Sequence, residues 1–198
     1  MRGFRKLLWP RLVAGLAGRP VTDPAVEPPE EVVAALAQRL DATARTRLGR
    51  SLAIREVDAG SCNGCELEVN AMAGVLYDLE RFGLRFVASP RHADILLVTG
   101  PVTRNMREAL ERTRACTPEP CWIVAAGDCA ADGGVFKGSY AVEGGVAPVL
   151  PVDLVIPGCP PTPMQLLEGM LALLQAQDPP KRTLAGAASE PRAEPPPG

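Results

Sequence analysis

The chain has 198 residues, of which 46% are hydrophobic and 4% aromatic, and its formal net charge is −2. That length suits one domain with extensions and is too short for two full domains. A nearly neutral charge argues against nucleic acid as the main partner, because binding to a phosphate backbone requires a surplus of basic side chains. With so few aromatic residues, Val, Leu, Ile and Ala must fill the core.

The first part of the chain, residues 1–50, is expected to form an N-terminal extension. It begins MRGFRKLLWPRLVAGLAG, where basic and apolar side chains are mixed as in an amphipathic segment that lies on an anionic membrane surface or docks on a partner. A loosely ordered leader fits this segment equally well. Pro10 and Arg11 interrupt its apolar run, which argues against a secretory signal, and no stretch is long enough to span a bilayer. A proline-rich spacer follows at 19–29, and a helix is predicted from Glu30 to about Leu48.

Short apolar runs and helical segments alternate from residue 51 to residue 177. The predicted strands lie at 52–58, 85–88, 95–99, 122–126 and 153–156. The predicted helices lie at 66–82, 104–114 and 163–174. This alternation predicts βαβ units and a three-layer α/β domain, in which a parallel sheet carries helices on both faces. The tail at 178–198 is rich in Pro, Ala and Glu, so it is expected to be disordered.

Cysteine motifs directly follow three of the predicted strands. The motifs are GSCNGCE with Cys62 and Cys65, GDC with Cys129, and PGCPP with Cys159. The carboxyl ends of parallel strands converge on one crevice, so these cysteines are expected to meet in space. Because no export signal stands out, they are expected to be reduced and to serve metal or redox chemistry rather than disulfide bonds.

Four converging thiolates predict one [4Fe–4S] cluster on Cys62, Cys65, Cys129 and Cys159. Each iron of a cubane needs one external soft ligand, which a thiolate supplies. The glycines beside these cysteines let the backbone pass close to a cluster, with its amides free to bond to sulfide.

Three other interpretations of the cysteines remain open. Four cysteines also suit zinc, although zinc ribbons usually present two close pairs rather than one pair and two single cysteines. CNGC between a strand and a helix also fits a thioredoxin-like dithiol, which would leave Cys129 and Cys159 without a role. Cysteines also serve as small buried hydrophobic residues, and this is the interpretation we favour for Cys116 and Cys121.

A family resemblance rests on four motifs: GSCNGCELE, FVASPRHADILLVTGPVTRNM, GDCAADGGVF and VDLVIPGCPPTP. They resemble the cluster-bearing small subunit shared by complex I and the membrane-bound, complex-I-like [NiFe] hydrogenases, which include formate hydrogenlyase-type enzymes. The resemblance covers residues 52–174. It implies a flavodoxin-like fold, one [4Fe–4S] cluster, and electron transfer to or from an adjacent large catalytic subunit. That partner carries the nickel–iron centre in hydrogenases and shares the quinone site in complex I.

The spacing of the first motif bears on the branch of the family. In this family, complex I members carry two adjacent cysteines there, whereas hydrogenase members carry C-x-x-C. Here Asn63 and Gly64 separate Cys62 from Cys65, so the motif has the C-x-x-C spacing. The resemblance therefore favours an electron-transfer subunit of a membrane-associated hydrogenase, with the cluster-bearing small subunit of NADH–quinone oxidoreductase (complex I) as the alternative. It also implies other iron–sulfur and membrane subunits as partners, and a peripheral position on the cytoplasmic side of the cell membrane.

Acidic and basic residues near these motifs are weaker candidates. By the same resemblance Glu66, which follows Cys65, is a possible proton relay, and Glu68 is a weaker one. Carboxylates also favour a helix N-terminus, so a solvated position there is the competing interpretation. His92 is the only histidine and could raise a cluster's potential together with Arg91, although a structural loop histidine is favoured. No nucleophile, phosphate loop or G-x-G-x-x-G motif stands out, so one-electron transfer is the expected function.

Overall fold

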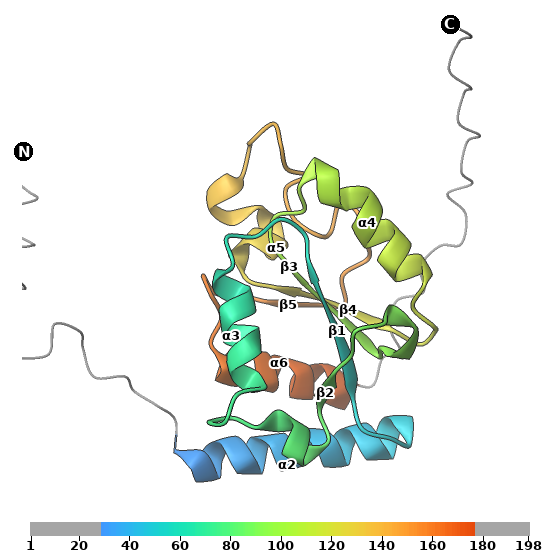
Figure 1. Cartoon of the computed structure of the whole chain (residues 1–198), viewed down its shortest axis with the longest axis vertical. Helices are drawn as coiled ribbons and strands as arrows, with labels where there is room; N and C mark the ends of the chain where they lie inside the picture. The colour runs from blue at the N-terminus through green and yellow to red at the C-terminus, as the bar shows by residue number, and fades with distance from the viewer. Residues whose placement is uncertain (1–28, 177–198) are drawn as a thin grey trace, which may run out of the picture.

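The computed structural model describes residues 29–176 (Figure 1). The predicted amphipathic segment, most of the proline-rich spacer and the predicted disordered tail lie outside the described residues. The described chain forms one sheet of five parallel strands in the order β2-β1-β3-β4-β5. The strands are β1 (Ala53–Asp58), β2 (Arg85–Phe86), β3 (Ile95–Thr99), β4 (Trp122–Ala126) and β5 (Leu154–Ile156). This is the flavodoxin-like order, so the predicted fold is confirmed.

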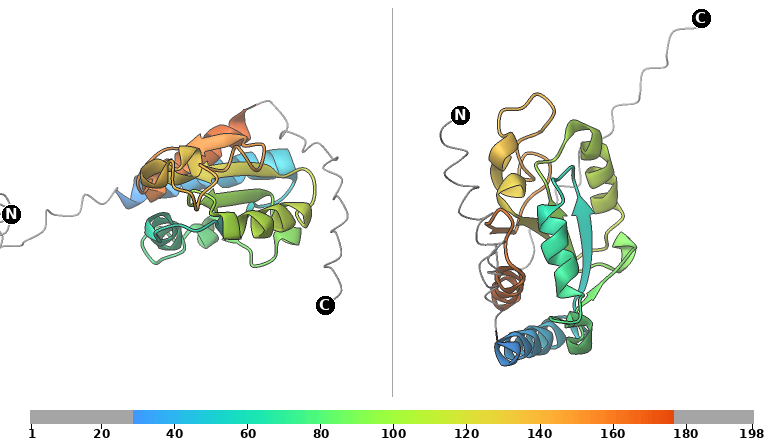
Figure 2. Two further views of the ribbon diagram at one scale, coloured as in Figure 1. Left: turned by 90° about the horizontal axis from the view of Figure 1, so that it is seen from above. Right: turned by 60° about the vertical axis from the view of Figure 1, so that its left-hand side comes forward.

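Helices lie on both faces of the sheet. The α-helices are α2 (Glu30–Leu48), α3 (Gly64–Met72), α4 (Arg104–Ala115), α5 (Asp128–Asp132) and α6 (Pro163–Gln175). The 3₁₀ helices are η1 (Leu79–Phe82), η2 (Pro90–His92) and η3 (Gly134–Phe136). α3 and α6 cover one face and α4 covers the other, as the right-hand view of Figure 2 shows. Among the described helices, none combines the length and the apolar character that crossing a bilayer requires.

The central strands are buried on both faces, as a parallel sheet between two helical layers requires. All five residues of β3 and all five of β4 are buried. Successive side chains of β3 alternate between two cores: Leu97 packs with α3 and α6, and Leu96 packs with α4. The last residues of the three central strands pair in register, Asp58 with Thr99 and Thr99 with Ala126. The loops that leave these strands therefore begin at one edge of the sheet.

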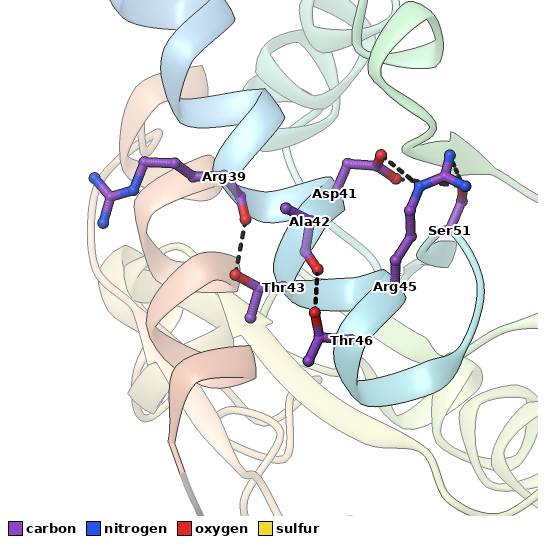
Figure 3. A network of polar contacts seen from close by, with 7 residues as sticks. All are labelled: Arg39, Asp41, Ala42, Thr43, Arg45, Thr46 and Ser51. Atoms are coloured by element: carbon purple, nitrogen blue, oxygen red, sulfur yellow. Dashed lines mark hydrogen bonds and ion pairs between the residues drawn. The ribbon is translucent and has the colours of Figure 1, made fainter.

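The predicted helix before the first strand is confirmed as α2. It crosses the amino-terminal end of the sheet and buries four side chains in the core shared with α6: Val33, Ala37, Leu40 and Ala44. Its last turns are tied to the chain that enters β1 (Figure 3): Arg45 Nε donates to Asp41 Oδ2 at 2.7 Å, and Arg45 Nη2 donates to Ser51 Oγ at 3.2 Å. The boundary predicted at residue 50 thus falls in a short connection between two packed elements.

One predicted helix is wrong in length. The pattern predicted a helix over 66–82, whereas α3 ends at Met72 and η1 begins only at Leu79. Gly74 weakens the helix, and the Asp78 N–H donates to the Gly74 carbonyl oxygen at 2.8 Å, which turns the chain. A helix that buries Val69 and Met72 would also bury Leu76 if it continued. Leu76 is exposed and Tyr77 is buried instead, so the helical spacing of buried residues ends there. The short helix α5 was not predicted at all.

Candidate metal centre

A small cavity of about 70 Å³ lies at the carboxyl edge of the sheet. Its lining includes the four cysteines that the sequence singled out: Cys62, Cys65, Cys129 and Cys159. Cys65 and Cys129 are buried, and Cys62 and Cys159 are exposed. The segments that follow β1, β4 and β5 therefore bring four thiols to one place, as the convergence of parallel strands requires. Their role as cluster ligands stays a prediction.

The loop that carries Cys62 is built by short polar side chains. The carboxylate of Asp58, at the end of β1, accepts hydrogen bonds at 2.8 Å from the backbone N–H groups of Gly60 and Ser61. Ser61 Oγ accepts a hydrogen bond from the Asn63 N–H at 3.0 Å. Asn63 has a φ of 71°, in the left-handed region that asparagine tolerates better than most residues. This turn leads the chain directly from Cys62 into α3.

Cys129 lies in α5, and the loop that follows folds back over its sulfur. The backbone N–H of Val135 donates a hydrogen bond to the Cys129 sulfur. A Cβ atom on Gly134 would lie 3.0 Å from the Cys129 Sγ and 3.0 Å from its backbone nitrogen. Gly134 also has a φ of 49°, so glycine suits this close approach. The loop thus presents an amide donor to a candidate ligand.

The loop that carries Cys159 is packed against its own prolines. A Cβ atom on Gly158, whose φ is 141°, would lie 2.6 Å from both the nitrogen and the Cα of Pro161. The next helix begins in a capping box, in which the Thr162 hydroxyl accepts a hydrogen bond from the Gln165 N–H while the Gln165 side chain accepts one from the Thr162 N–H. Cys159 is therefore held between a tight turn and a well-capped helix.

Burial and crowding raise the pKa values of the inner thiols. The pKa of Cys65 is raised from 9.0 to about 12, first by burial, then by the Glu66 carboxylate and the other three thiols. Burial also raises the pKa of Cys129, against the lowering effect of the Val135 N–H. The thioredoxin-like interpretation leaves Cys129 and Cys159, which line the same cavity as Cys62 and Cys65, without a role. Coordination to a metal deprotonates such a thiol outright.

Glu66 lies beside this site and is buried. Its side chain is in the first turn of α3, and the residue is 7% exposed. Neither carboxylate oxygen has a hydrogen-bond partner within the part of the chain that the structure describes. The competing interpretation, a solvated carboxylate at a helix start, is therefore wrong for Glu66. Glu68 is half-buried.

A second acidic residue, which the sequence did not single out, lies close to Glu66. The pKa of Glu56 on β1 is raised from 4.5 to about 7, first by burial and then by the charges of Glu66 and Asp58, with Arg55 acting in the opposite direction. One oxygen of the Glu56 carboxyl is buried without a hydrogen-bond partner among the described residues. The sequence could have indicated Glu56, because a glutamate in the middle of the strand AIREVD occupies a position where apolar residues are usual.

The remaining candidates lie at the opposite edge of the sheet. His92 and Arg91 are exposed in η2. Two residues after His92, the Asp94 N–H donates to the carbonyl oxygen of Ala53, the first residue of β1, at 2.8 Å. The structural role expected for His92 stays a prediction. Cys121 directly precedes β4 and is buried, as predicted, but Cys116 is exposed at the end of α4, so the prediction of burial is wrong there.

The donor set fits an iron–sulfur cluster. Four thiols surround one cavity, an amide points at one sulfur, and glycines stand where the backbone comes close. Within residues 29–176, no group of three or more His, Cys, Asp or Glu side chains is arranged to hold a metal ion. In a cubane each thiolate binds a different iron, so the ligands surround a core of several atoms instead of one ion.

Known proteins resemble this chain over the same region. Formate hydrogenlyase subunit 7 of Escherichia coli (strain K12) is 48% identical over 128 residues, which are 65% of this chain and 50% of that protein. The probable membrane-bound hydrogenase subunit mbhJ of Pyrococcus furiosus is 44% identical over 128 residues, which are 65% of this chain and 77% of that protein. The chain thus spans half the length of the first relative and about three quarters of the second.

The fold is also found in a solved complex. The structure of the membrane-bound sulfane sulfur reductase, an archaeal respiratory membrane complex, contains a chain that matches with a TM-score of 0.57 and 33% identity. The match covers 69% of this chain and 73% of that chain. Residues 62–173 match the family model described as "NADH ubiquinone oxidoreductase, 20 Kd subunit". This range spans the cysteine-bearing domain from its first cysteine to its last helix, and the chain belongs to that family.

Proposed function

We propose that this chain holds one [4Fe–4S] cluster on Cys62, Cys65, Cys129 and Cys159, and that it is the electron-transfer subunit of a membrane-associated oxidoreductase complex. The observation that carries the proposal is the meeting of four thiols, from three loops, around one cavity. Family membership supports it, since the matched region begins at Cys62 and spans all four cysteines.

The protein's own residues give such a site its properties. The three loops set the positions of the four sulfur atoms, and the Val135 N–H donates to the sulfur of Cys129. Cys65 and Cys129, which are buried, and Cys62 and Cys159, which are exposed, line the same cavity. A bound cluster supplies reversible one-electron transfer, with reduction potentials between roughly −700 and +450 mV in this class. Burial, amide donors and nearby charges determine where within that range a given site lies.

The partner would be an adjacent large catalytic subunit that docks over the cysteine loops. Large apolar side chains are exposed on the segments that carry Cys65 and Cys129: Leu67, Val135, Phe136 and Tyr140. Exposed apolar groups of this size are typical of a surface that a partner covers. Other iron–sulfur and membrane subunits would complete the complex. A peripheral position on the cytoplasmic side of the membrane follows for this subunit.

We favour a complex-I-like [NiFe] hydrogenase over an NADH–quinone oxidoreductase. The spaced pair Cys62 and Cys65 is the sequence feature that supports this choice, and relatives named as subunits of a formate hydrogenlyase and a membrane-bound hydrogenase support it as well. The alternative, a complex I small subunit that passes electrons towards quinone, draws on the family description. The sequence of the large subunit that binds this chain would distinguish them, because two C-x-x-C pairs in it would indicate nickel.

Glu66 is proposed as a proton-carrying group beside the cluster. It is buried, it directly follows Cys65, and its carboxylate lacks hydrogen-bond partners among the described residues. Glu56 interacts with it electrostatically from β1. A buried carboxyl without fixed partners can accept and release a proton with little rearrangement of its surroundings.

Anaerobic purification tests the proposal directly. The chain should be brown, contain about four irons and four acid-labile sulfides, and show an electron paramagnetic resonance (EPR) signal after one-electron reduction. Zinc without sulfide would support a structural zinc site instead. A colourless chain that takes up neither iron nor sulfide after reconstitution would refute the cluster.

A further inference from the structure

The loops that carry Cys129 and Cys159 are joined by two hydrogen bonds between the same two residues. The backbone N–H of Asp128 donates to the carbonyl oxygen of Gly158 at 2.8 Å. The backbone N–H of Gly158 donates in return to the Asp128 side-chain Oδ1, also at 2.8 Å. Strand pairing between β4 and β5 ends at Ala126 and Ile156, so these bonds lie just beyond the ladder. They continue the connection between the two strands up to the residues next to the cysteines.

Only one of these two bonds depends on a side chain. The bond donated by the Asp128 N–H is available to any residue except proline, whereas the bond accepted by Oδ1 needs a short side chain with an acceptor oxygen. Gly158 has little freedom to compensate, because its turn is packed against Pro161. Loss of the Asp128 oxygen would therefore leave the Gly158 N–H, which is half-buried, without this partner.

The carboxylate of Asp128 is also a charge at the cysteine site. Asp128 lines the same cavity as the four cysteines. A negative charge at the wall of this cavity disfavours the addition of an electron to a group bound inside it, because the electron makes the site more negative.

We propose that Asp128 is a positioning residue of the cysteine site, which holds the Cys129 and Cys159 loops at a fixed separation, and that its negative charge lowers the reduction potential of a cluster bound there. This inference rests on the proposed cluster. It separates two roles of one carboxylate: the hydrogen bond to Gly158 sets geometry, and the charge sets the potential.

Two substitutions at Asp128 separate the two roles. Asp128→Asn keeps an oxygen that can accept from the Gly158 N–H but removes the charge. Asp128→Ala removes both. The full chain is loaded with iron and sulfide anaerobically, and iron content, the EPR spectrum of the reduced form and the reduction potential are measured.

Asp153 provides the matched control at the opposite edge of the sheet. Its Oδ2 accepts a hydrogen bond from the Ile123 N–H at 2.8 Å, and it too connects the β5 segment to β4 across 30 residues of sequence. Asp153→Asn therefore removes the same charge but keeps an acceptor oxygen, and Asp153→Ala removes both the charge and a similar bond, in each case far from the cysteines. Both control variants should keep the iron content, EPR spectrum and potential of the wild type.

Asp128→Asn is expected to keep the wild-type iron content and EPR line shape while its reduction potential shifts upwards. Asp128→Ala is expected to lose iron several-fold faster and to show altered g-values. An unchanged potential in Asp128→Asn would overturn the role of the charge, even if Asp128→Ala fails to fold. Wild-type iron retention and g-values in Asp128→Ala would overturn the positioning role. A wild-type chain without a cluster would refute the proposed function itself, which is a separate result.

Discussion

Gly127 and Cys65 approach each other so closely that no side chain fits between them. A Cβ atom on Gly127 would lie 2.7 Å from the Cys65 Sγ and 3.4 Å from the Gly158 carbonyl oxygen. Gly127 has a φ of 92° and a ψ of 159°, a combination that is essentially restricted to glycine. The loop after β4 is therefore pressed against Cys65, which lies in the first turn of α3. This contact connects two of the three loops, and Asp128 connects the third.

Gly127→Ala should displace Cys65 and empty the site. The added methyl group requires movement of the sulfur or of the loop, and the backbone conformation of Gly127 adds about 1–3 kcal/mol of strain for any other residue. Iron content should fall several-fold in this variant. Gly138→Ala is the control, because Gly138 also has a positive φ, of 81°, but a Cβ atom there would meet nothing within 4 Å. Equal iron contents in the two variants would contradict the importance of the close contact.

Cys159→Ala should remove one ligand without creating a buried cavity. Cys159 is exposed, so the free energy of unfolding should change little in the cluster-free chain. After reconstitution the variant should lack an intact four-iron cluster, measured by iron and sulfide content and by EPR. Cys116→Ala, which also replaces an exposed cysteine, should keep the full cluster. A normal cluster in Cys159→Ala would remove Cys159 from the ligand set.

Glu56→Gln should stabilise the fold at pH 8 and change it less at pH 5. The folded-state pKa of Glu56 is raised from 4.5 to about 7, so the folded chain binds this proton more tightly than the unfolded chain. Stability therefore falls as the pH rises from about 4.5 to about 7, and a neutral side chain removes that loss. The gain at pH 8 should be about 1–2 kcal/mol, since partial exposure weakens the effect.

Urea unfolding of the cluster-free chain at the two pH values measures this difference. Glu80→Gln is a suitable control, because Glu80 is exposed and the same charge is removed. It should have nearly the same small effect at both pH values. A gain from Glu56→Gln that did not depend on pH would show that the Glu56 charge is not the cause.

Asp94→Ala should destabilise the fold while leaving the cysteine site intact. Asp94 is 2% exposed, its Oδ2 accepts from the Ala53 N–H at 2.9 Å, and its Oδ1 lies 2.6 Å from Arg50 Nη2. Removal of this buried acceptor should cost about 2–4 kcal/mol. Arg50→Ala should cost about 1 kcal/mol or less, because the Arg50 side chain is 53% exposed. Urea unfolding measures both changes. An altered EPR spectrum in Asp94→Ala would contradict the expectation that this end of the sheet does not affect the cysteine site.

Much of the fold could be predicted from local patterns. The runs ILLVT and WIVAA predicted β3 and β4 with the bounds that the structure has, because continuous apolar runs suit strands buried on both faces. The helix before β1 was also correct in its bounds. The end of α3 was not, because burial of Tyr77 and Leu79 against α2 and its neighbours decides where that helix stops. Packing between distant segments overrides local helix propensity there.

By itself, the sequence determined the alternation of strands and helices, and it placed cysteines directly after three strands. These features depend on backbone sterics and on the spacing of apolar residues, which are local along the chain. Only the tertiary structure decided that Glu66 is buried, that Glu56 lies near it, and that Asp128 bonds to Gly158. Such contacts join residues far apart in sequence. They exist only once the crossover helices have packed on the sheet and brought the strand ends together.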